Sequence, residues 1–310
     1  MRRLILKWRE RNTMKKKKAF IIGFALPCTL SLIIMYLYPA LRTIAMSFFK
    51  IGSVTTSVSE WSFNGLGNYL KIFNSAVYQT SMKNMLVIWV VGGVLTLSLS
   101  LLFAVILTSG IRFKKFFRAA IYLPNIISAV ALATMWIQYI YSQDYGLLNR
   151  ILGIFGLEGV KWLGTDTKFW AMLIAFVFGA VGYYMLIFIS GIERIPQDIF
   201  EAATIDGTNR IQQFVHITLP LLKSIIRTNI TFWSISVITF FLWTKMFSPV
   251  NSEASTIVPV VFLYDTAFGG KGTVTRDAGA GAAIGVVLAL FVALVYFVFN
   301  RLLKEDDLEF

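Results

Sequence analysis

Long apolar runs, separated by polar segments, are the main pattern of this sequence. A helix needs about 20 mainly apolar residues to cross a hydrocarbon core about 30 Å thick. We expect six transmembrane helices, at Ala19–Leu41, Met85–Ser109, Ala119–Ile140, Phe169–Ile192, Ser224–Phe247 and Ala278–Phe299. The pattern therefore predicts an all-α integral membrane protein with about six spans.

The composition agrees with this fold class. Hydrophobic residues make up 57% of the chain and charged residues only 15%, whereas a soluble domain carries about 25% charged residues. The mean hydropathy is +0.70. Because no small-residue cleavage site closes the first apolar run, we interpret it as a retained span and not as a cleaved signal.

Basic residues are concentrated on one side of the predicted spans. Nine of the 29 Lys and Arg lie in residues 1–18, and four more (Arg112, Lys114, Lys115 and Arg118) lie in one short loop. With the N-terminus inside, the inner segments hold 19 basic residues and the outer segments 10. Short cytoplasmic loops are enriched in Lys and Arg, so we predict that both termini are cytoplasmic. The basic residues do not form a nucleic-acid-reading surface, and nucleic acid is not an expected partner.

These assignments divide the chain into four parts. They are a basic cytoplasmic N-terminus (1–18), a first span with its outer loop (19–84), a five-span core (85–299) with a cytoplasmic loop at 193–223, and a cytoplasmic tail (300–310). The outer loops are 42–84, 141–168 and 248–277, and none is long enough for a separate enzyme domain.

The six predicted membrane cores contain no Asp, Glu or His, and their basic residues, Arg227 and Lys245, lie near the ends. Ion-coupled carriers usually place ionisable groups at mid-depth. An ion-coupled secondary carrier or channel for a small polar solute is therefore the weaker alternative. A membrane-embedded enzyme would need clustered acid, base or nucleophile side chains, which the cores lack. The single histidine, His216, excludes a multi-histidine metal site, so no metal is expected.

The loop 193–223 contains a predicted short helix. Pro196 suits a first helical turn, Asp198 and Glu201 lie near the positive end of the helix, and Gly207 ends it. Ile199, Ala202 and Ala203 recur at i, i+3 and i+4, which makes one shallow apolar face. This face is suited to docking in the groove of a partner, although an ordinary amphipathic connector would have the same pattern.

The run Glu201-Ala-Ala-x-x-Asp206-Gly207, followed by Phe214, Ile217 and Leu219-Pro220, resembles the EAA motif of the inner-membrane permeases of binding-protein-dependent ABC importers. It lies where that family has it, two spans before the C-terminus. Other stretches resemble the carbohydrate-uptake branch, the maltose and glycerol-3-phosphate type permeases: Tyr38-Pro39, Phe63 to Tyr69, Leu123-Pro124 and Asp144 to Asn149. The Gly-Gly-Pro turn that often follows the fifth span in this family is replaced by Ser248-Pro249-Val250.

The resemblance implies a type I ABC importer permease in a bacterial plasma (inner) membrane. Such a subunit is not catalytic and holds no cofactor, because ATP and Mg are bound by two separate ATP-binding subunits. The other implied partners are a second permease subunit, usually in a heterodimer, an extracytoplasmic solute-binding protein and membrane lipid. The implied solute is a carbohydrate, for which we expect an oligosaccharide.

The resemblance also assigns roles to residues. The EAA loop would be the coupling helix that fits the ATPase, with Glu201 and Asp206 as polar anchors. Ala202, Ala203 and Gly207 would be small because bulk would block docking.

The resemblance places the solute near mid-membrane, among the last three spans, where aromatic and hydrogen-bonding side chains would hold it. The candidates are Tyr183, Tyr184, Trp233, Ser236 and Thr239, with Asn229 nearer the cytoplasmic side. For any one aromatic residue, helix packing is the competing interpretation. Tyr183 is preferred because its ring and its hydroxyl can both contact a sugar.

Small residues in two spans indicate close helix packing. Gly279, Gly281 and Gly285 have the spacing that lets helices approach each other in membranes. Gly92-Gly93 predicts either a flexing point or a close contact.

Overall fold

The computed structural model describes residues 20–270 and 275–303. The predicted basic segment 1–18 and most of the predicted tail, residues 304–310, lie outside the described residues. The first half of the chain holds η1 (Ile33–Leu37), α2 (Tyr38–Met46), β1 (Phe49–Lys50), η2 (Val58–Glu60), β2 (Ser62–Phe63), α3 (Gly67–Phe73), α4 (Ala76–Val87), η3 (Ile88–Gly92), α5 (Gly93–Thr108), α6 (Lys114–Ile126), α7 (Ala129–Met135), η4 (Trp136–Ile140) and α8 (Leu147–Ile154). The second half holds α9 (Lys168–Ile192), α10 (Gln197–Ile205), α11 (Arg210–Gln213), η5 (Phe214–Thr218), α12 (Leu219–Leu221), α13 (Lys223–Ile238), α14 (Phe241–Phe247), α15 (Pro259–Phe268) and α16 (Ala278–Leu302).

Four continuous helices are long and apolar enough to cross a membrane: Phe20–Met46, Ala76–Thr108, Lys168–Ile192 and Ala278–Leu302. Two bent pairs complete six spans if each pair counts as one: α6 with α7 and η4, bent by 99°, and α13 with α14, bent by 47°. The all-helical fold with about six spans is therefore confirmed. In the third and fifth spans a bend divides the helix, which the hydropathy pattern did not predict.

The break in the third span has a local cause. Pro124 lies inside α6 and cannot donate a backbone hydrogen bond, and Ile127 leaves the helix with an extended backbone at ψ 137°. Ser128 then caps α7, because its hydroxyl accepts the Ala131 N–H at 3.2 Å. In the fifth span, Thr239 and Phe240 depart from helical geometry between α13 and α14.

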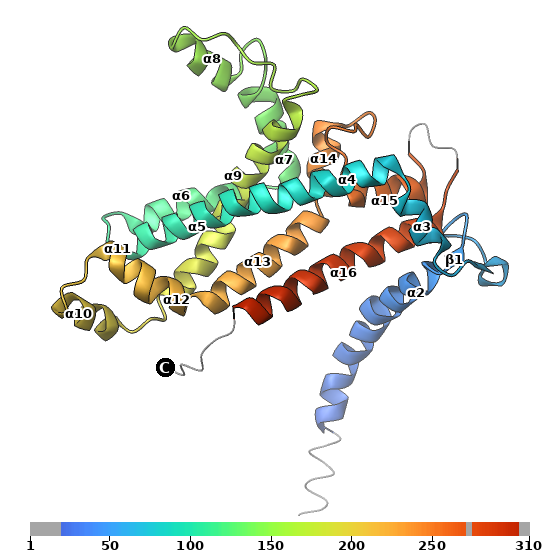
Figure 1. Cartoon of the computed structure of the whole chain (residues 1–310), viewed down its shortest axis with the longest axis horizontal. Helices are drawn as coiled ribbons and strands as arrows, with labels where there is room; N and C mark the ends of the chain where they lie inside the picture. Colours follow the sequence, from blue (N-terminus) through green and yellow to red (C-terminus); the bar gives the residue numbers. More distant parts are fainter. Residues whose placement is uncertain (1–19, 271–274, 304–310) are drawn as a thin grey trace, which may run out of the picture.

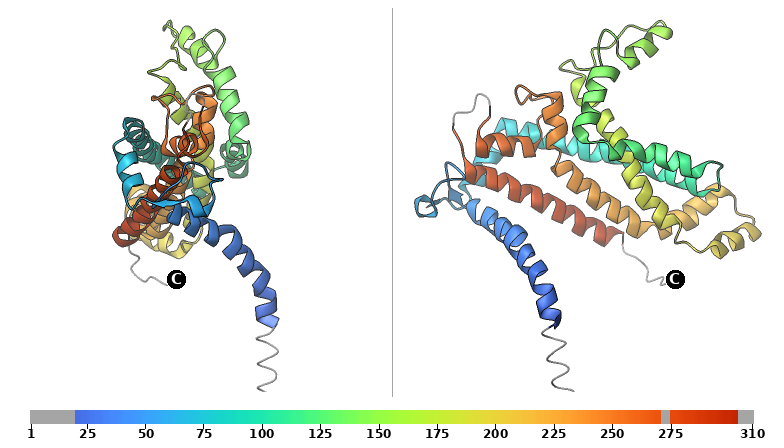
Figure 2. Two further views of the ribbon diagram at one scale, coloured as in Figure 1. Left: turned by 90° about the vertical axis from the view of Figure 1, so that its right-hand side faces the viewer. Right: turned by 180° about the vertical axis from the view of Figure 1, so that it is seen from behind.

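The helices form one body from which two segments project (Figure 1). Figures 1 and 2 show three neighbouring helical rods: the continuous helix of α4 and α5, then α13, then α16. Helix α9 packs against α5 and α6. The first span extends away from this body, and its most apolar stretch is 0% buried. The segment α7–η4–α8 projects on another side.

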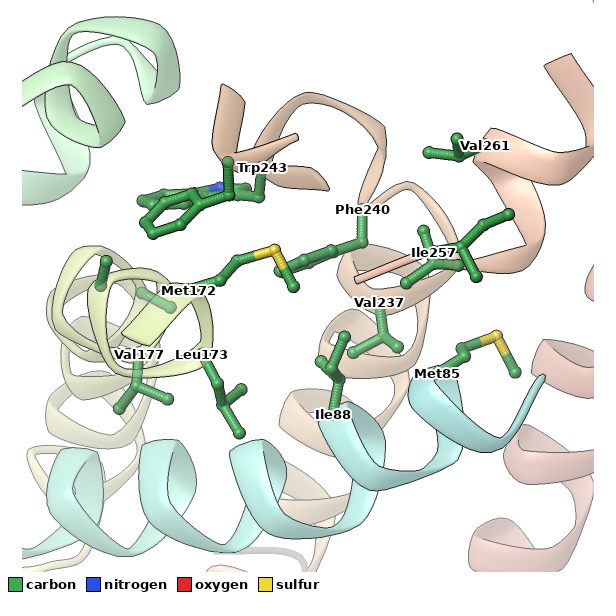
Figure 3. Close-up of a cluster of buried hydrophobic side chains, with 14 of the residues drawn as sticks. Met85, Ile88, Met172, Leu173, Val177, Val237, Phe240, Trp243, Ile257 and Val261 are labelled. Atoms are coloured by element: carbon green, nitrogen blue, oxygen red, sulfur yellow. The ribbon is translucent and has the colours of Figure 1, made fainter. Parts of the chain in front are cut away.

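The core is built from the faces of several helices, as Figure 3 shows. Met85 lies in α4 and Ile88 in η3, and α9 contributes Met172, Leu173 and Val177. Val237 lies in α13, Phe240 at the junction and Trp243 in α14. Ile257 precedes α15, and Val261 lies within it. These residues hold the break between α13 and α14 against α9, which positions the cavity described below.

The small residues of α16 allow close contact, as the sequence predicts. A side chain at Gly279 would clash with the carbonyl oxygen of Phe49, and a Cβ atom at Gly281 would lie 2.7 Å from the Cβ atom of Ala267 in α15. Gly182 allows a similar close contact between α9 and α6, because a side chain at this position would clash with the Ile121 carbonyl. Gly182 was not among the glycines predicted to make close contacts.

Candidate functional site

A cavity of about 200 Å³ lies where α9 meets the broken span α6–α7 and the junction of α13 with α14. Its walls combine aromatic rings with hydrogen-bonding groups: Asn125, Phe176, Tyr183, Tyr184, Ser236 and Trp243. Three of the six predicted solute contacts, Tyr183, Tyr184 and Ser236, therefore line one space.

The two tyrosines have different roles in this wall. Tyr184 is only 2% exposed, and its hydroxyl oxygen lies 3.0 Å from Ser236 Oγ. Because Ser236 donates its own hydroxyl to the Phe232 carbonyl at 3.0 Å, Tyr184 must donate to Ser236. Tyr183 is 37% exposed, and its ring stands edge-on to Tyr184 with the centroids 5.1 Å apart. Tyr184 thus joins α9 to α13, while Tyr183 presents its ring to the cavity.

Two lining residues, Asn125 and Trp243, were missed by the sequence analysis. The Asn125 amide nitrogen lies 3.4 Å from the Gly179 carbonyl, so its amide oxygen can accept a hydrogen bond from a solute. The Trp243 indole stands edge-on to Phe176, with centroids 5.6 Å apart. Both residues lie next to the break of a bent span, Asn125 at the end of α6 and Trp243 at the start of α14, and Pro124 was the sequence signal for the first break.

Trp233 does not line the cavity. It is 1% exposed, and its indole nitrogen donates to the Trp89 carbonyl at 2.9 Å. A Cβ atom at Gly93 would lie 2.7 Å from that nitrogen, and one at Gly92 would lie 3.0 Å from the ring. Trp233 is therefore packed in the core of this structure, and the predicted close contact at Gly92-Gly93 is confirmed.

Asn229 and Thr239 also lie outside the cavity wall. Asn229 is fully buried in α13, and neither of its amide atoms has a hydrogen-bond partner among the described residues. Thr239 is exposed and donates to the Ile235 carbonyl of its own helix at 2.9 Å. The structure therefore brings together half of the predicted solute set and separates the rest.

The predicted short helix in the loop 193–223 is α10. Pro196 is its N-cap and not its first residue, Asp198 lies in the first turn, and Gly207 follows the helix end at φ +81°. Glu201, Ala202, Asp206 and Gly207 are exposed, whereas Ala203 is buried. The predicted face of Ile199, Ala202 and Ala203 therefore does not present all three side chains outward.

Two exposed isoleucines flank the end of α10. Ile205 is 87% exposed and Ile211 is 75% exposed. Ile205 is the last residue of α10 and directly precedes Asp206, whereas Ile211 lies in α11; neither was predicted as a contact. Ile205 falls on an unspecified position of the motif, so the motif gave no signal for it.

Internal hydrogen bonds hold this loop as a unit. The buried Gln213 donates to Thr204 Oγ1 at 3.0 Å, and the Thr208 hydroxyl donates to the Ala203 carbonyl at 2.6 Å. Asn209 and Gln212 form a capping box at the start of α11. The outward face of α10 is therefore presented on a fixed support.

An ion pair fastens the loop to the helical body. Arg118 on α6 lies 2.8 Å from Glu193, which immediately follows α9. The pair therefore joins α6 to the point where the loop leaves α9, and both of these helices contribute to the wall of the cavity.

A second group of ion pairs lies at the far end of α9. Lys168 contacts Glu253 at 2.8 Å, and Lys245 on α14 contacts Asp265 on α15 at 3.3 Å. Ser252 donates a short hydrogen bond to Asp265. The segment 248–258, which includes Ser248-Pro249-Val250, is thus tied to α9 on one side and to α15 on the other.

The sequence matches a family model described as binding-protein-dependent transport system inner membrane component, over residues 97–305. The arabinooligosaccharides transport system permease protein AraP of Halalkalibacterium halodurans is 31% identical over 87% of this chain and 83% of the relative. The trehalose/maltose transport system permease protein MalF of Thermococcus litoralis is 29% identical over 90% of this chain and 93% of the relative.

A chain in the crystal structure of a bacterial ABC transporter involved in the import of the acidic polysaccharide alginate has a similar fold. It superposes with a TM-score of 0.78 at 19% sequence identity, covering 96% of this chain and 99% of that chain. A second structure of such a transporter, in complex with an alginate pentasaccharide-bound periplasmic protein, gives a TM-score of 0.77 at 17% identity over 94% of this chain and 96% of that chain.

Proposed function

This chain belongs to the family of binding-protein-dependent transport system inner membrane components, and we propose that it is one permease subunit of an ATP-driven importer of a carbohydrate. It forms half of the translocation pathway, and the second half comes from a second permease subunit, in a heterodimer. The chain itself carries out no chemistry. The pathway runs through a bacterial inner membrane, with both termini of the chain on the cytoplasmic side.

The cavity between α9 and α13 carries the proposal that the solute is a carbohydrate. Sugars present apolar C–H faces, which pack on aromatic rings, and hydroxyl groups, which exchange hydrogen bonds. Tyr183 and Trp243 supply rings, and Tyr184, Ser236 and Asn125 supply acceptors or donors in the same space. Relatives named for arabinooligosaccharide and trehalose/maltose transport support the same solute class. An oligosaccharide, delivered by an extracytoplasmic binding protein, is the proposed solute.

The exposed face of α10 supports a docking role toward one of two ATP-binding subunits, which bind ATP and Mg. Glu201 and Asp206 are solvent-exposed anchors, and Ala202 and Gly207 keep the surface between them shallow. When the ATP-binding subunits close, they displace α10. Because the loop is internally hydrogen-bonded and tied to α6 by Arg118 and Glu193, the displacement reaches the cavity wall.

The broken third span lets the cavity change its access. The backbone at Ile127 is extended, so α6 and α7 can reorient about this point without breaking helical hydrogen bonds. A movement of α6 against α9 then opens the cavity to one side of the membrane or the other. An ion-coupled carrier, which is the alternative, is not favoured by the family match.

Reversal of the Glu201 charge tests this function. The chain is co-expressed with its genomic neighbours, and ATP hydrolysis by the assembled complex is measured in membranes. We expect Glu201→Arg to lower solute-stimulated ATP hydrolysis about tenfold or to release the ATP-binding subunits. A tenfold change corresponds to a loss of about 1.4 kcal/mol in the interaction between α10 and the ATP-binding subunit. Glu60→Arg is the matched control, because Glu60 is also exposed but lies in the predicted outer loop 42–84. Full activity in a complex that retains the Glu201→Arg chain contradicts the assignment.

A further inference from the structure

A second cavity lies on the outside of α4 and η3, away from the cavity between α9 and α13. This groove has a volume of about 610 Å³ and an almost wholly apolar lining. The apolar side chains include Phe73, Leu86, Val87, Val90 and Val91. Nothing in the transport pathway proposed above uses this groove.

The groove has one polar end. Gln79, Lys83, Leu86 and Val90 are all exposed and recur at the spacing of one helix face. Along this face the two polar residues come first and the apolar residues follow. From Lys83 to Val91 the helix rises roughly 12 Å, which fits within one leaflet, about half of a 30 Å hydrocarbon core.

Lys83 lies at the boundary where the membrane is expected to begin. It comes two residues before the predicted second span, Met85–Ser109. No ion pair to Lys83 occurs among residues 20–270 and 275–303. The three other described lysines nearest the outer ends of spans, Lys71, Lys168 and Lys245, each contact a carboxylate. The Lys83 ammonium is therefore available to an external anion.

We propose that this groove binds an anionic phospholipid, with an acyl chain along Leu86, Val87 and Val90 and the headgroup phosphate at Lys83. A long lysine side chain at a helix end reaches the headgroup level while its stem covers apolar surface. The groove matches an anionic phospholipid in charge, because the Lys83 cation lies at one end of it. It also matches in length, because its apolar part fits within one leaflet. A partner helix seated here would have to supply a carboxylate of its own at the same depth.

Native mass spectrometry of the whole transporter in detergent tests the proposal, with phosphatidylglycerol and phosphatidylcholine titrated as probes. We expect one phosphatidylglycerol molecule to bind more tightly than phosphatidylcholine. Lys83→Glu should weaken phosphatidylglycerol binding at least fivefold, since one basic residue contributes about that factor toward anionic lipid. Lys50→Glu is the matched control, because Lys50 is exposed on β1, outside the groove.

A second pair of variants tests the apolar part without changing charge. Val90→Trp fills the groove and should weaken the binding of both lipids, whereas Val94→Trp, one turn further on the same exposed face, should not. Equal affinity for the two lipids, unchanged by Lys83→Glu, overturns the proposal. So does a Val90→Trp chain that keeps its lipid but no longer assembles with the second permease, because the groove would then be a protein interface. Neither result depends on the solute that the importer carries.

Discussion

The hydroxyl of Tyr184 on α9 lies 3.0 Å from that of Ser236 on α13 and donates to it. This bond joins the two helices at the wall of the cavity. Removing it with Tyr184→Phe leaves Ser236 bonded to its own helix, so we expect a loss of only about 1 kcal/mol in stability. Uptake should fall because the wall loses one of its hydroxyl groups. Thermal unfolding measures the effect on stability, and transport in proteoliposomes measures the effect on uptake. Ser236→Ala should give the same fall in uptake if the two hydroxyls act as a pair, and unchanged uptake in both variants argues against a solute contact here.

The exposed ring of Tyr183 should contribute to solute affinity more than to stability. We expect Tyr183→Ala to raise the KM of uptake about tenfold, which corresponds to about 1.4 kcal/mol. Tyr296→Ala is the matched control, because Tyr296 is a similarly exposed tyrosine on α16 that does not line the cavity. The prediction is measured by the concentration dependence of solute uptake. An equal change in both variants would mean that lost packing, and not solute contact, is responsible.

Trp233 should behave as a core residue. We expect Trp233→Ala to destabilise the protein by about 3–5 kcal/mol, because the indole fills the contact with Gly92 and Gly93 and donates to the Trp89 carbonyl. Thermal unfolding of the purified complex in detergent measures this loss. Trp170→Ala, at an exposed position of α9, provides the control and should change stability little. A stable Trp233→Ala protein with weakened solute binding would return Trp233 to the solute site.

Hydropathy predicted which segments cross the membrane, because burial in lipid requires about 20 apolar residues in sequence. It did not predict the bend between Ile126 and Ala129, since the segment as a whole stays apolar and the local signals, Pro124 and Ser128, do not change its mean hydropathy enough to divide it. It also could not tell which face of a span points inward, because a helix that is apolar all round has little amphipathic pattern. Trp233 and Trp243 are therefore equivalent in sequence, yet one packs on glycines and the other lines the cavity.

The EAA-type motif, Glu201 to Gly207, allowed the opposite kind of prediction, because its spacing predicts a local structure. Gly207 ends α10 as expected, since its positive φ suits glycine. The sequence did not reveal that Ala203 faces the protein interior, because the support behind it comes from Thr208 and Gln213, which lie outside the helix. The outward face of a short helix depends on such tertiary contacts.

The neighbouring alanines of α10 should respond differently to added bulk. Ala203→Leu places a larger side chain in a buried position, so we expect a destabilised loop that proteases cleave more readily, at a cost of about 1–3 kcal/mol. Ala202→Leu enlarges an exposed surface and should leave the loop intact while weakening assembly with the ATP-binding subunits. Limited proteolysis and co-purification separate the two effects. If Ala202→Leu assembles normally, the exposed face of α10 is not the docking surface.

The ion pair between Lys168 and Glu253 should hold the segment 248–258 against the start of α9. Both carboxylate oxygens lie within 2.9 Å of the lysine nitrogen, but the pair is partly solvated, so we expect a coupling energy of about 1 kcal/mol. A double-mutant cycle with Lys168→Met and Glu253→Gln, read by thermal unfolding at low and high salt, measures it. The coupling energy should decrease as the salt concentration rises.

The same variants also test whether the segment controls access to the cavity. If it does, either single variant should raise ATP hydrolysis in the absence of solute. Lys71→Met, which breaks a more exposed pair with Asp277, should not. Additive effects of the two variants on stability would show that the pair does not fasten this segment.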